Sequence, residues 1–388
     1  MRVAIATQAA TGHVYPLMPL ALALRASGHD VTFMTGQDLV PWLERLGFPA
    51  QAVGESIGWA LAQVQARNPD LTTSLPREEA WKLDAAIFAD VLPRAVAPAM
   101  VTALAGLRPD VLVYEASDLG ALLAAAELGV PAVCLGIWAA GSWHVEDDEM
   151  VARVRAVWDE RAAGPLTVSP LYGDAYLDPC PPSLRVPGAG DAGTRHLPTH
   201  QVRWGDPGMR LPDWVPGRRA RPLAYLTLGT VGWGTAALLR AAVEGLARLP
   251  VDVLVAAGPY FDPADLGALP ASVRVERMVR QDLLLPHADV VVHHAGSGTL
   301  LGAFVHGIPQ LVLPIGADQF QNADALVRGG AGLVVPPDGV TPDAITAGVQ
   351  ALLEDPSYRA AAGRVAAEIA GMPTPADRVR DLVDIAAG

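Results

Sequence analysis

His13 is the residue near the N-terminus whose type and position best suit acid–base chemistry. It stands in the sequence GHVYP, residues 12–16, directly after the strand-like stretch Val3–Thr7. A neutral imidazole accepts a proton efficiently near pH 7. Because ligands bind at the carboxyl ends of parallel strands, we expect His13 to face a substrate and to act as a general base. The alternative is a histidine at the start of a helix with no chemical role.

Two acids close to another predicted strand could orient such a base. Glu115 directly follows the strand Val111–Tyr114, and Asp118 comes a few residues later. A carboxylate that is hydrogen-bonded to a histidine fixes which ring nitrogen carries the proton and stabilises the imidazolium that forms. Either acid is therefore a candidate partner for His13.

A second group of residues has the features of an anion site. The run HHAGSGT, residues 293–299, follows the apolar stretch Val290–Val292 and opens a predicted helix. Small residues let the backbone approach a phosphate, and the N–H groups and dipole of a helix N-terminus favour negative charge by about 0.3–1 kcal/mol. His294 could donate a further hydrogen bond. For this run alone, a tight turn that binds nothing is the alternative.

The elements that must position these residues alternate between strands and helices. In the first half the predicted order is strand Val3–Thr7, helix Tyr15–Ala26, strand Val31–Thr35, a less regular and partly helical stretch from Trp59 to Leu107, strand Val111–Tyr114, helix Leu119–Leu128 and strand Ala132–Ile137. Parallel strands joined by helices in this way form a doubly wound α/β sheet.

The same alternation starts again after a Pro- and Gly-rich stretch, 179–221, whose composition is typical of a linker. The elements predicted there are strand Leu223–Leu228, helix Ala236–Arg248, strands Asp252–Ala256 and Val273–Arg277, helix Gln281–Leu285, strand Val290–His293, helix Thr299–His306, strand Gln310–Leu313 and a last helix, Asp377–Ala386. A chain of 388 residues is also long enough for two cores. We predict two Rossmann-like domains, 1–215 and 216–372, facing an interdomain cleft, and a C-terminal helix, 373–388, packed back on the first domain.

The run from His294 to Ala323 carries a specific resemblance. HAGSGT, then GIPQ, a buried strand and PIGADQFQNA together resemble the nucleotide-sugar signature of the family 1 GT-B glycosyltransferases. The bacterial members that decorate macrolides and enediynes are the most similar, and the sequence around His13 resembles their N-terminal Gly-His-x-x-Pro motif. The resemblance implies the GT-B fold and an inverting transfer of a sugar, expected to be a deoxysugar, from a nucleoside diphosphate to a small natural-product aglycone.

The resemblance also implies roles for individual residues. His13 is the general base, and Glu115, where relatives often carry aspartate, is its orienting acid, with Asp118 as the alternative. Asp318 and Gln319 hydrogen-bond the donor sugar, although Asp318 could instead cap a helix. The other donor-binding candidates are Gly12, Thr230, Met278, Val279, His294, Gly296, Ser297, Gly298 and Thr299.

One part of the family pattern is missing. Where relatives have an aromatic residue followed by Val, Pro and Gln, this chain has MVRQ, residues 278–281. Backbone groups of Val279 can still pair with a pyrimidine edge, but Met278 offers a different stacking surface. The most similar relatives use thymidine diphosphate deoxysugars, so we expect a dTDP-sugar donor, with a uridine diphosphate donor as the alternative.

Composition and missing motifs argue against other classes of protein. The net charge of −13 opposes nucleic-acid binding. The first turn, QAATGH, lacks the G-x-G-x-x-G of dinucleotide-binding proteins. Two cysteines and one acidic run in a polar loop, 146–149, supply no metal-spaced set. With no signal peptide and no long apolar span recognised, we expect a cytoplasmic, metal-independent protein with no membrane span and no cofactor beyond its nucleotide-sugar co-substrate.

The expected partners are an aglycone and a nucleotide sugar. Aromatic walls suit an apolar acceptor, and the candidates in the first domain are Trp59, Trp81, Phe88, Trp138 and Trp143. Each of these rings can equally be a core residue. A homodimer is compatible with the sequence. Two rival functions also stay open: a non-catalytic helper protein of the same fold, and a nucleotide-sugar epimerase.

Overall fold

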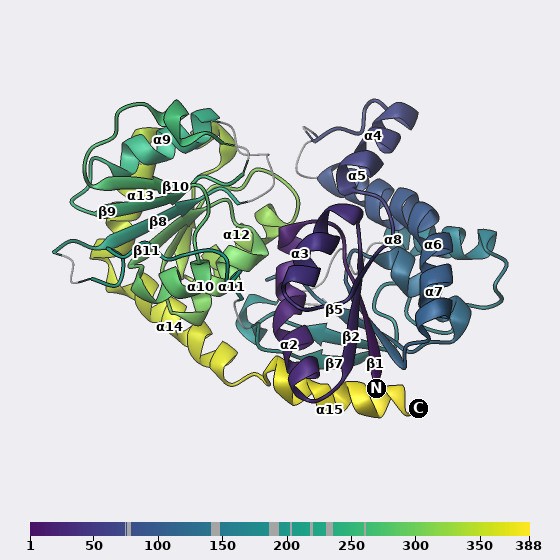
Figure 1. Ribbon diagram of the computed structural model, residues 1–388. Coiled ribbons are helices and arrows are strands. Elements are labelled where there is room, and N and C mark those ends of the chain that lie inside the picture. The colour runs from purple at the N-terminus through teal and green to yellow at the C-terminus, as the bar shows by residue number, and fades with distance from the viewer. Residues whose placement is uncertain are drawn as a thin grey trace. The chain divides into compact units, whose positions relative to one another are not determined.

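The protein is represented by a computed structural model that describes residues 1–73, 75, 79–140, 148–185, 194–201, 204–217, 220–229, 236–259 and 261–388. The chain forms two compact units. Unit 1 contains Met1–Pro179, Pro187–Val202 and Pro373–Gly388, and unit 2 contains Cys180–Val186 and Arg203–Met372. Each unit is built on one parallel sheet (Figure 1).

The sheet of unit 1 has seven strands in the order β3-β2-β1-β4-β5-β6-β7. They are β1 (Arg2–Ala6), β2 (Asp30–Thr35), β3 (Ala50–Ala52), β4 (Val111–Glu115), β5 (Ala132–Leu135), β6 (Ala175–Asp178) and β7 (Arg195–Pro198). The central strands β1 and β4 are almost entirely apolar, because helices cover both faces of the sheet. The strand order reverses between them, and this switch point is where doubly wound sheets bind ligands.

Helices pack on both faces of this sheet. They are α1 (Thr11–Val14), η1 (Tyr15–Leu17), α2 (Met18–Ala26), η2 (Gln37–Leu39), α3 (Val40–Arg45), α4 (Ile57–Arg67), α5 (Ala80–Ala86), η4 (Ile87–Val91), α6 (Leu92–Leu107), α7 (Leu119–Leu128), α8 (Asp148–Glu160) and α15 (Pro375–Ala386). Helices α6, α7 and α8 share one buried cluster with β1 and β4, and α15 packs on α2.

The stretch Ala80–Leu107 is one continuous helical run with a π-helical turn, η4, in its middle. The sequence predicted a less regular and partly helical stretch from Trp59 to Leu107. Prolines stand at 93 and 98 inside the helical run. By length and composition alone this helix could cross a membrane. More than half of its most apolar window is instead buried against the rest of unit 1.

The sheet of unit 2 has six strands in the order β10-β9-β8-β11-β12-β13. They are β8 (Leu223–Thr227), β9 (Asp252–Ala256), β10 (Val273–Glu276), β11 (Val290–His293), β12 (Gln310–Val312) and β13 (Gly332–Val334). Side chains that alternate along β8 enter two separate clusters, one on each face of the sheet. The strand order again reverses at a central pair, β8 and β11.

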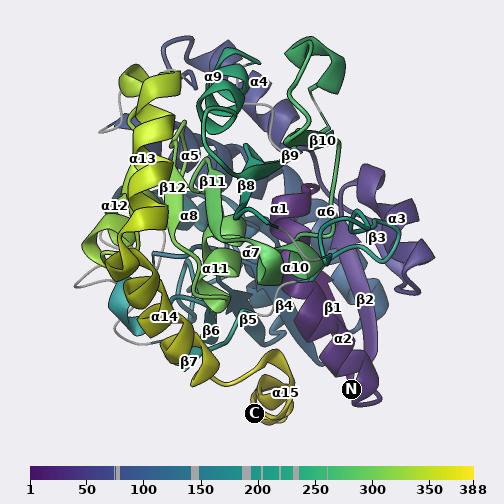
Figure 2. The same ribbon diagram turned by 90° about the vertical axis from the view of Figure 1, so that its left-hand side faces the viewer.

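Helices cover both faces of this second sheet as well. They are η5 (Pro182–Leu184), α9 (Ala236–Leu246), η6 (Pro263–Leu266), α10 (Gln281–Leu284), η7 (Leu285–His287), α11 (Ser297–Val305), α12 (Gln319–Arg328), η8 (Pro337–Gly339), α13 (Pro342–Glu354) and α14 (Pro356–Ala370). Helix α13 packs against α9 and the strands β11 to β13, and α14 continues from it along unit 2 (Figure 2).

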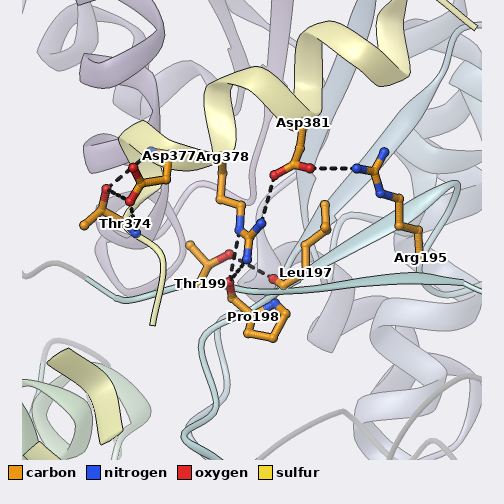
Figure 3. A network of polar contacts seen from close by, with 8 residues as sticks. All are labelled: Arg195, Leu197, Pro198, Thr199, Thr374, Asp377, Arg378 and Asp381. Carbon is orange, nitrogen blue, oxygen red and sulfur yellow. Dashed lines mark hydrogen bonds and ion pairs between the residues drawn. The ribbon is translucent and has the colours of Figure 1, made fainter. Parts of the chain in front are cut away.

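Helix α15 is held on unit 1 by a network of polar contacts (Figure 3). The Arg378 Nε donates to the Pro198 carbonyl at 3.0 Å, and its Nη1 bonds Asp381 at 2.8 Å. Arg195, on β7, bonds the other oxygen of Asp381 at 2.7 Å. A capping box closes the first turn of the helix. The last sixteen residues, Pro373–Gly388, therefore belong to unit 1.

The two units divide at a different place from the predicted boundary at 215/216. Residues Arg195–Pro198, expected in a linker, form the edge strand β7, where a proline is tolerated. Leu211, Trp214 and Val215 pack in the core of unit 2. The division after Val202 thus reflects burial, which Pro- and Gly-rich composition does not reveal.

Candidate functional site

His13 and Glu115 come together at the switch point of unit 1. His13 lies on α1, the first turn after β1, and Glu115 is the last residue of β4, which pairs with β1. The His13 Nδ1 lies 3.0 Å from the Glu115 Oε1. The side chain of His13 is 19% exposed and that of Glu115 is fully buried. The sequence placed these two residues at the ends of separate strands, and the sheet makes them neighbours.

The Glu115 carboxylate is held by several donors. Its Oε1 accepts the Ser117 hydroxyl at 2.7 Å and the Gln8 N–H at 3.3 Å, and its Oε2 accepts the Ser117 N–H at 2.9 Å. Burial alone raises the pKa of Glu115, but the interaction with His13 and the hydrogen bonds from His13 and Ser117 outweigh it. The resulting pKa lies below the ordinary value for glutamate. Glu115 is therefore a carboxylate at neutral pH.

This geometry fixes the form of the His13 ring. A carboxylate at Nδ1 requires a proton on that nitrogen, which leaves a lone pair on Nε2. The Ser117 hydroxyl donates its proton to Glu115. Its Oγ lies 3.2 Å from the His13 Nδ1, so it presents a lone pair to the N–H at that nitrogen. His13 is thus arranged to accept a proton at Nε2.

Asp118, the other candidate acid, has a different position. It is the N-cap of α7, and its carboxylate accepts the Ala121 N–H at 3.3 Å. Burial and the negative charge of Glu115 raise the pKa of Asp118 from 3.8 to about 7. The hydrogen bond to His13 is made by Glu115, as the resemblance implied, while Asp118 caps a helix beside it.

The raised pKa of Asp118 makes a prediction about stability. Asp118 loses its proton near pH 3.8 in the unfolded chain but only near pH 7 in the folded protein. The stability that Asp118 contributes to the folded protein is therefore fully present below pH 3.8 and is lost as the pH rises through 7. Asparagine caps a helix equally well and has no such proton. We expect Asp118→Asn to raise the melting temperature relative to wild type by several degrees at pH 8 and by less at pH 5. A difference that does not vary with pH would contradict this account.

Phe88 is the aromatic candidate whose ring stacks on His13. It lies on the π-helical turn η4, and its ring stacks on His13 with centroids 6.5 Å apart and planes at 27°. Turns of this kind are frequent at functional sites. Of the other rings, Trp138 is 9% exposed, Trp81 packs against the core, Trp59 is 37% exposed, and Trp143 lies outside the described residues.

The predicted phosphate residues lie together at the switch point of unit 2. Strand β11 pairs with β8, with His293 opposite Thr227, so the loops that follow the two strands are adjacent. The His294 ring lies between Gly229 and Gly296, within 3 Å of where a Cβ on either glycine would be. Burial lowers the pKa of His294 to about 4, against the effect of a hydrogen bond with the Thr227 backbone. His294 is therefore a neutral ring rather than a cation at pH 7.

The start of α11 offers backbone N–H groups beside this histidine. Gly296 is the N-cap, no side chain caps the helix, and its first intrahelical backbone bond is made by the Leu300 N–H. The first N–H groups of a helix have no acceptor inside it. The N–H groups of Ser297, Gly298 and Thr299 are in this position. These are the groups that the sequence analysis assigned to a diphosphate.

The close packing around His294 makes a second prediction. A Cβ on Gly296 would lie 2.4 Å from the His294 Nε2, although the φ of Gly296 is −62°, which alanine adopts readily. The His294 ring must therefore move. We expect Gly296→Ala to weaken TDP binding at least about tenfold, because one good hydrogen bond to the charged diphosphate would be lost. Calorimetric titration measures this. The control is Gly363→Ala on α14, whose Cβ would touch nothing; equal affinities in the two variants would contradict the role of His294.

Asp318 and Gln319 are both tied into unit 2. The Asp318 Oδ2 accepts the Ser297 hydroxyl at 2.6 Å and the Asn322 Nδ2 at 2.8 Å. The Gln319 Oε1 accepts the Ile315 N–H at 2.7 Å. Asp318 is the N-cap of α12 by position, but its side chain makes no capping hydrogen bond. The helix-capping alternative therefore does not account for this side chain, which joins Ser297 at the start of α11 to Asn322 on α12.

The segment 278–281 keeps the valine and the glutamine of the family pattern and lacks its aromatic residue and its proline. Val279 is buried in a core cluster, and Met278 is half-buried. Arg280, in place of proline, forms an ion pair with Asp282 at 2.7 Å. Gln281, which matches the pattern, donates to the Thr299 hydroxyl at 3.1 Å. The segment thus contacts the start of α11.

Two donor-binding candidates stand apart from the others. Thr230 lies outside the described residues. Gly12 is exposed on α1 in unit 1, and a Cβ there would meet nothing, so the structure gives no steric reason for glycine. All other described donor-binding candidates lie in unit 2.

Sequence analysis did not single out three buried polar residues of these sites: Ser117, Gln310 and Asn322. Gln310 accepts from the His293 Nε2 at 2.8 Å, and burial lowers the pKa of His293 to about 3, so that histidine supports the loop from inside the sheet. Asn322 stands four residues after Asp318 on one helix face, a spacing that the sequence does show. Within the ranges that the structure describes, no group of three or more His, Cys, Asp or Glu side chains could hold a metal ion.

Comparison with known proteins shows the family to which this chain is similar. Residues 241–385 match the family described as Erythromycin biosynthesis protein CIII-like, C-terminal domain. The L-demethylnoviosyl transferase of Streptomyces niveus is 34% identical over 382 residues, which cover 97% of this chain and 96% of that protein.

Two solved structures are similar over almost the whole chain. The glycosyltransferase SsfS6 of Streptomyces sp. SF2575, complexed with thymidine diphosphate, has a TM-score of 0.81 and 28% identity, and the match covers 99% of each chain. The Spinosyn Rhamnosyltransferase SpnG, complexed with spinosyn aglycone, has a TM-score of 0.83 and 27% identity, over 99% of this chain and 100% of that one.

Proposed function

From the premise that this chain belongs to the GT-B glycosyltransferases of antibiotic biosynthesis, we propose that it is an inverting enzyme with His13 as its general base. Its donor is a thymidine diphosphate deoxysugar and its acceptor is a hydroxyl of a small aglycone. The observation that carries this proposal is the 3.0 Å hydrogen bond between His13 and the buried Glu115.

Inversion follows from a single displacement at the anomeric carbon. His13 Nε2 removes the proton from the acceptor hydroxyl while the oxygen attacks the face opposite the leaving diphosphate. The imidazolium that forms is stabilised by Glu115 at Nδ1. No covalent sugar–enzyme bond is needed, so the configuration at the anomeric carbon changes once.

Unit 2 supplies the donor half of the reaction. Negative charge develops on the diphosphate as the sugar leaves, and the N–H groups at the start of α11 and the neutral His294 can donate to it. Asp318 and Gln319 have carboxylate and amide groups suited to sugar hydroxyls. Donors of this kind take the place of a metal ion, and the proposed enzyme uses neither a metal nor another cofactor.

The relatives support the choice of substrates. SsfS6 was solved with thymidine diphosphate and SpnG with an aglycone. The MVRQ segment keeps the valine and the glutamine of the family pattern, which suits a pyrimidine base. The thymidine diphosphate bound to SsfS6 makes thymidine the base we propose, with uridine as the alternative.

Calorimetric titration with TDP, UDP and NAD in the presence of EDTA tests the donor site. Micromolar binding of TDP and not of NAD is expected. NMR of the glycoside formed from an α-configured dTDP-sugar then tests the stereochemistry, and the β-linked product is expected. Binding of TDP without transfer to any aglycone would favour the non-catalytic helper protein, and an epimerised free nucleotide sugar would favour the epimerase.

A further inference from the structure

Asn322 is a buried residue of α12 whose side chain bonds both segments of the donor site. It is 0% exposed. Its Nδ2 lies 2.9 Å from the Ala295 carbonyl, 3.0 Å from the Ser297 Oγ and 2.8 Å from the Asp318 Oδ2. Ser297 also donates to the same oxygen of Asp318. The Asn322 carboxamide therefore joins the loop before α11 to Asp318, the first of the two residues proposed to contact the sugar.

These two segments have unfavourable backbone conformations. Ala295 has a φ of +70° and Ala317 a φ of +51°, and they are two of four described non-glycine residues with positive φ. Such conformations persist where the surrounding contacts over-determine them, and they concentrate at functional sites. The hydrogen bond from Asn322 fixes the Ala295 carbonyl, and its bond to Asp318 fixes the residue after Ala317.

The chemistry of these contacts requires an amide N–H₂ group. A carbonyl and a carboxylate both need donors, and the two N–H bonds of a carboxamide supply them. If the Asn322 amide were turned over, its Oδ1 would face the Ala295 carbonyl and the Asp318 carboxylate and could donate to neither. A carboxylate at this position would repel Asp318, because like charges at hydrogen-bond distance cannot both be accommodated when buried.

We propose that Asn322 is a positioning residue for the donor, which holds the diphosphate loop, 294–299, and Asp318 in one fixed geometry. This inference rests on the proposed donor site. It assigns to Asn322 no contact with the substrate; the residue acts through the Ala295 peptide, Ser297 and Asp318. Its loss should weaken binding of the diphosphate and of the sugar together.

The experiment compares TDP and TDP-glucose binding by calorimetry in wild type, Asn322→Ala and Asn322→Asp. Asn322→Ala is expected to raise both dissociation constants about tenfold or more. The control is Gln350→Ala, which removes an exposed carboxamide of the same unit that bonds only Glu354 at 2.8 Å in the described structure, and its affinities should match wild type. Melting curves confirm that each variant is folded.

The Asn322→Asp variant gives a readout that depends on protonation. At pH 8 its carboxylate repels Asp318, and TDP should bind about tenfold more weakly than to wild type. At pH 5.5 two adjacent carboxyl groups share a proton, which restores one donor, so the affinity relative to wild type should recover to within about threefold. If Asn322→Ala does not fold, this pH comparison decides the question alone.

The outcomes separate the two levels of the argument. Wild-type protein that binds TDP, with equal affinity in a folded Asn322→Ala variant, would overturn the role of Asn322 and leave the donor site in place. A constant ratio between Asn322→Asp and wild type from pH 8 to pH 5.5 would do the same. Wild-type protein that binds neither ligand would overturn the proposed donor site and this inference with it.

Discussion

Replacing His13 with alanine should lower the turnover number by about 10²- to 10⁴-fold, the usual contribution of a general base. The acceptor hydroxyl then has to lose its proton to water, which is a much weaker base than imidazole. TDP binding should stay the same, because the described donor candidates, Gly12 excepted, lie in unit 2 and His13 in unit 1. Single-turnover transfer from a TDP-sugar, with calorimetry of TDP on the same preparation, measures both quantities.

The matched control for this variant is His29→Ala. His29 lies in the same unit and bonds the N-terminal amine at 3.3 Å, and its loss should leave transfer unchanged. Full activity in His13→Ala would remove His13 from the mechanism. Loss of TDP binding in that variant would instead show that the substitution disturbs more than the base.

Replacing Glu115 with glutamine should lower turnover by about 10²- to 10⁴-fold as well. The amide keeps the shape of the carboxylate but offers an N–H₂ group to Nδ1, which favours the ring form with its proton on Nε2. That nitrogen then has no lone pair for the acceptor proton. The buried negative charge that stabilises the imidazolium is also lost. Single-turnover transfer again gives the measurement.

The double variant shows whether the two residues act as a unit. In His13→Ala/Glu115→Gln the losses should not add, because a carboxylate that acts through the base has no effect once the base is gone. Glu115→Asp keeps the charge and should retain more activity than Glu115→Gln. Additive losses in the double variant would mean that Glu115 acts independently of His13.

The pairing of His13 with Glu115 could be predicted because it depends on strand order. Each residue lies at the carboxyl end of a strand, and the two strands, β1 and β4, are the neighbouring parallel strands at which the strand order reverses. His294 and the start of α11 follow in the same way from a strand–turn–helix sequence. Local pattern and topology are enough for residues at strand ends.

Ser117 and Asn322 could not be predicted in this way, because their roles depend on contacts across the sheet edge. A serine two residues after Glu115 is common in turns, and only the fold shows that its hydroxyl reaches both Glu115 and His13. Asn322 needs the Ala295 carbonyl, 27 residues earlier in the chain, to have a partner. The state of His294 as a neutral ring likewise depends on burial, which the sequence does not give.

For the fold, the alternation of strands and helices predicted both sheets but not all of their elements. The short strands β3, β6, β7 and β13 and the helices α13 and α14 were missed. RHLP in β7 has little apolar character and contains a proline. The helical run Ala80–Leu107 was underestimated as a less regular and partly helical stretch.

The contacts of α15 with β7 constrain how sugar specificity can be moved between relatives. Residues of unit 1 stand before and after unit 2 along this sequence. A chimera joined at a single point would combine an α15 from one parent with the Pro198 carbonyl and Arg195 of the other. A transplant of unit 2, the proposed donor-binding unit, therefore needs two junctions, one before Arg203 and one after Met372. It must also match the short segment Cys180–Val186, whose Leu184 carbonyl bonds Arg328 of unit 2.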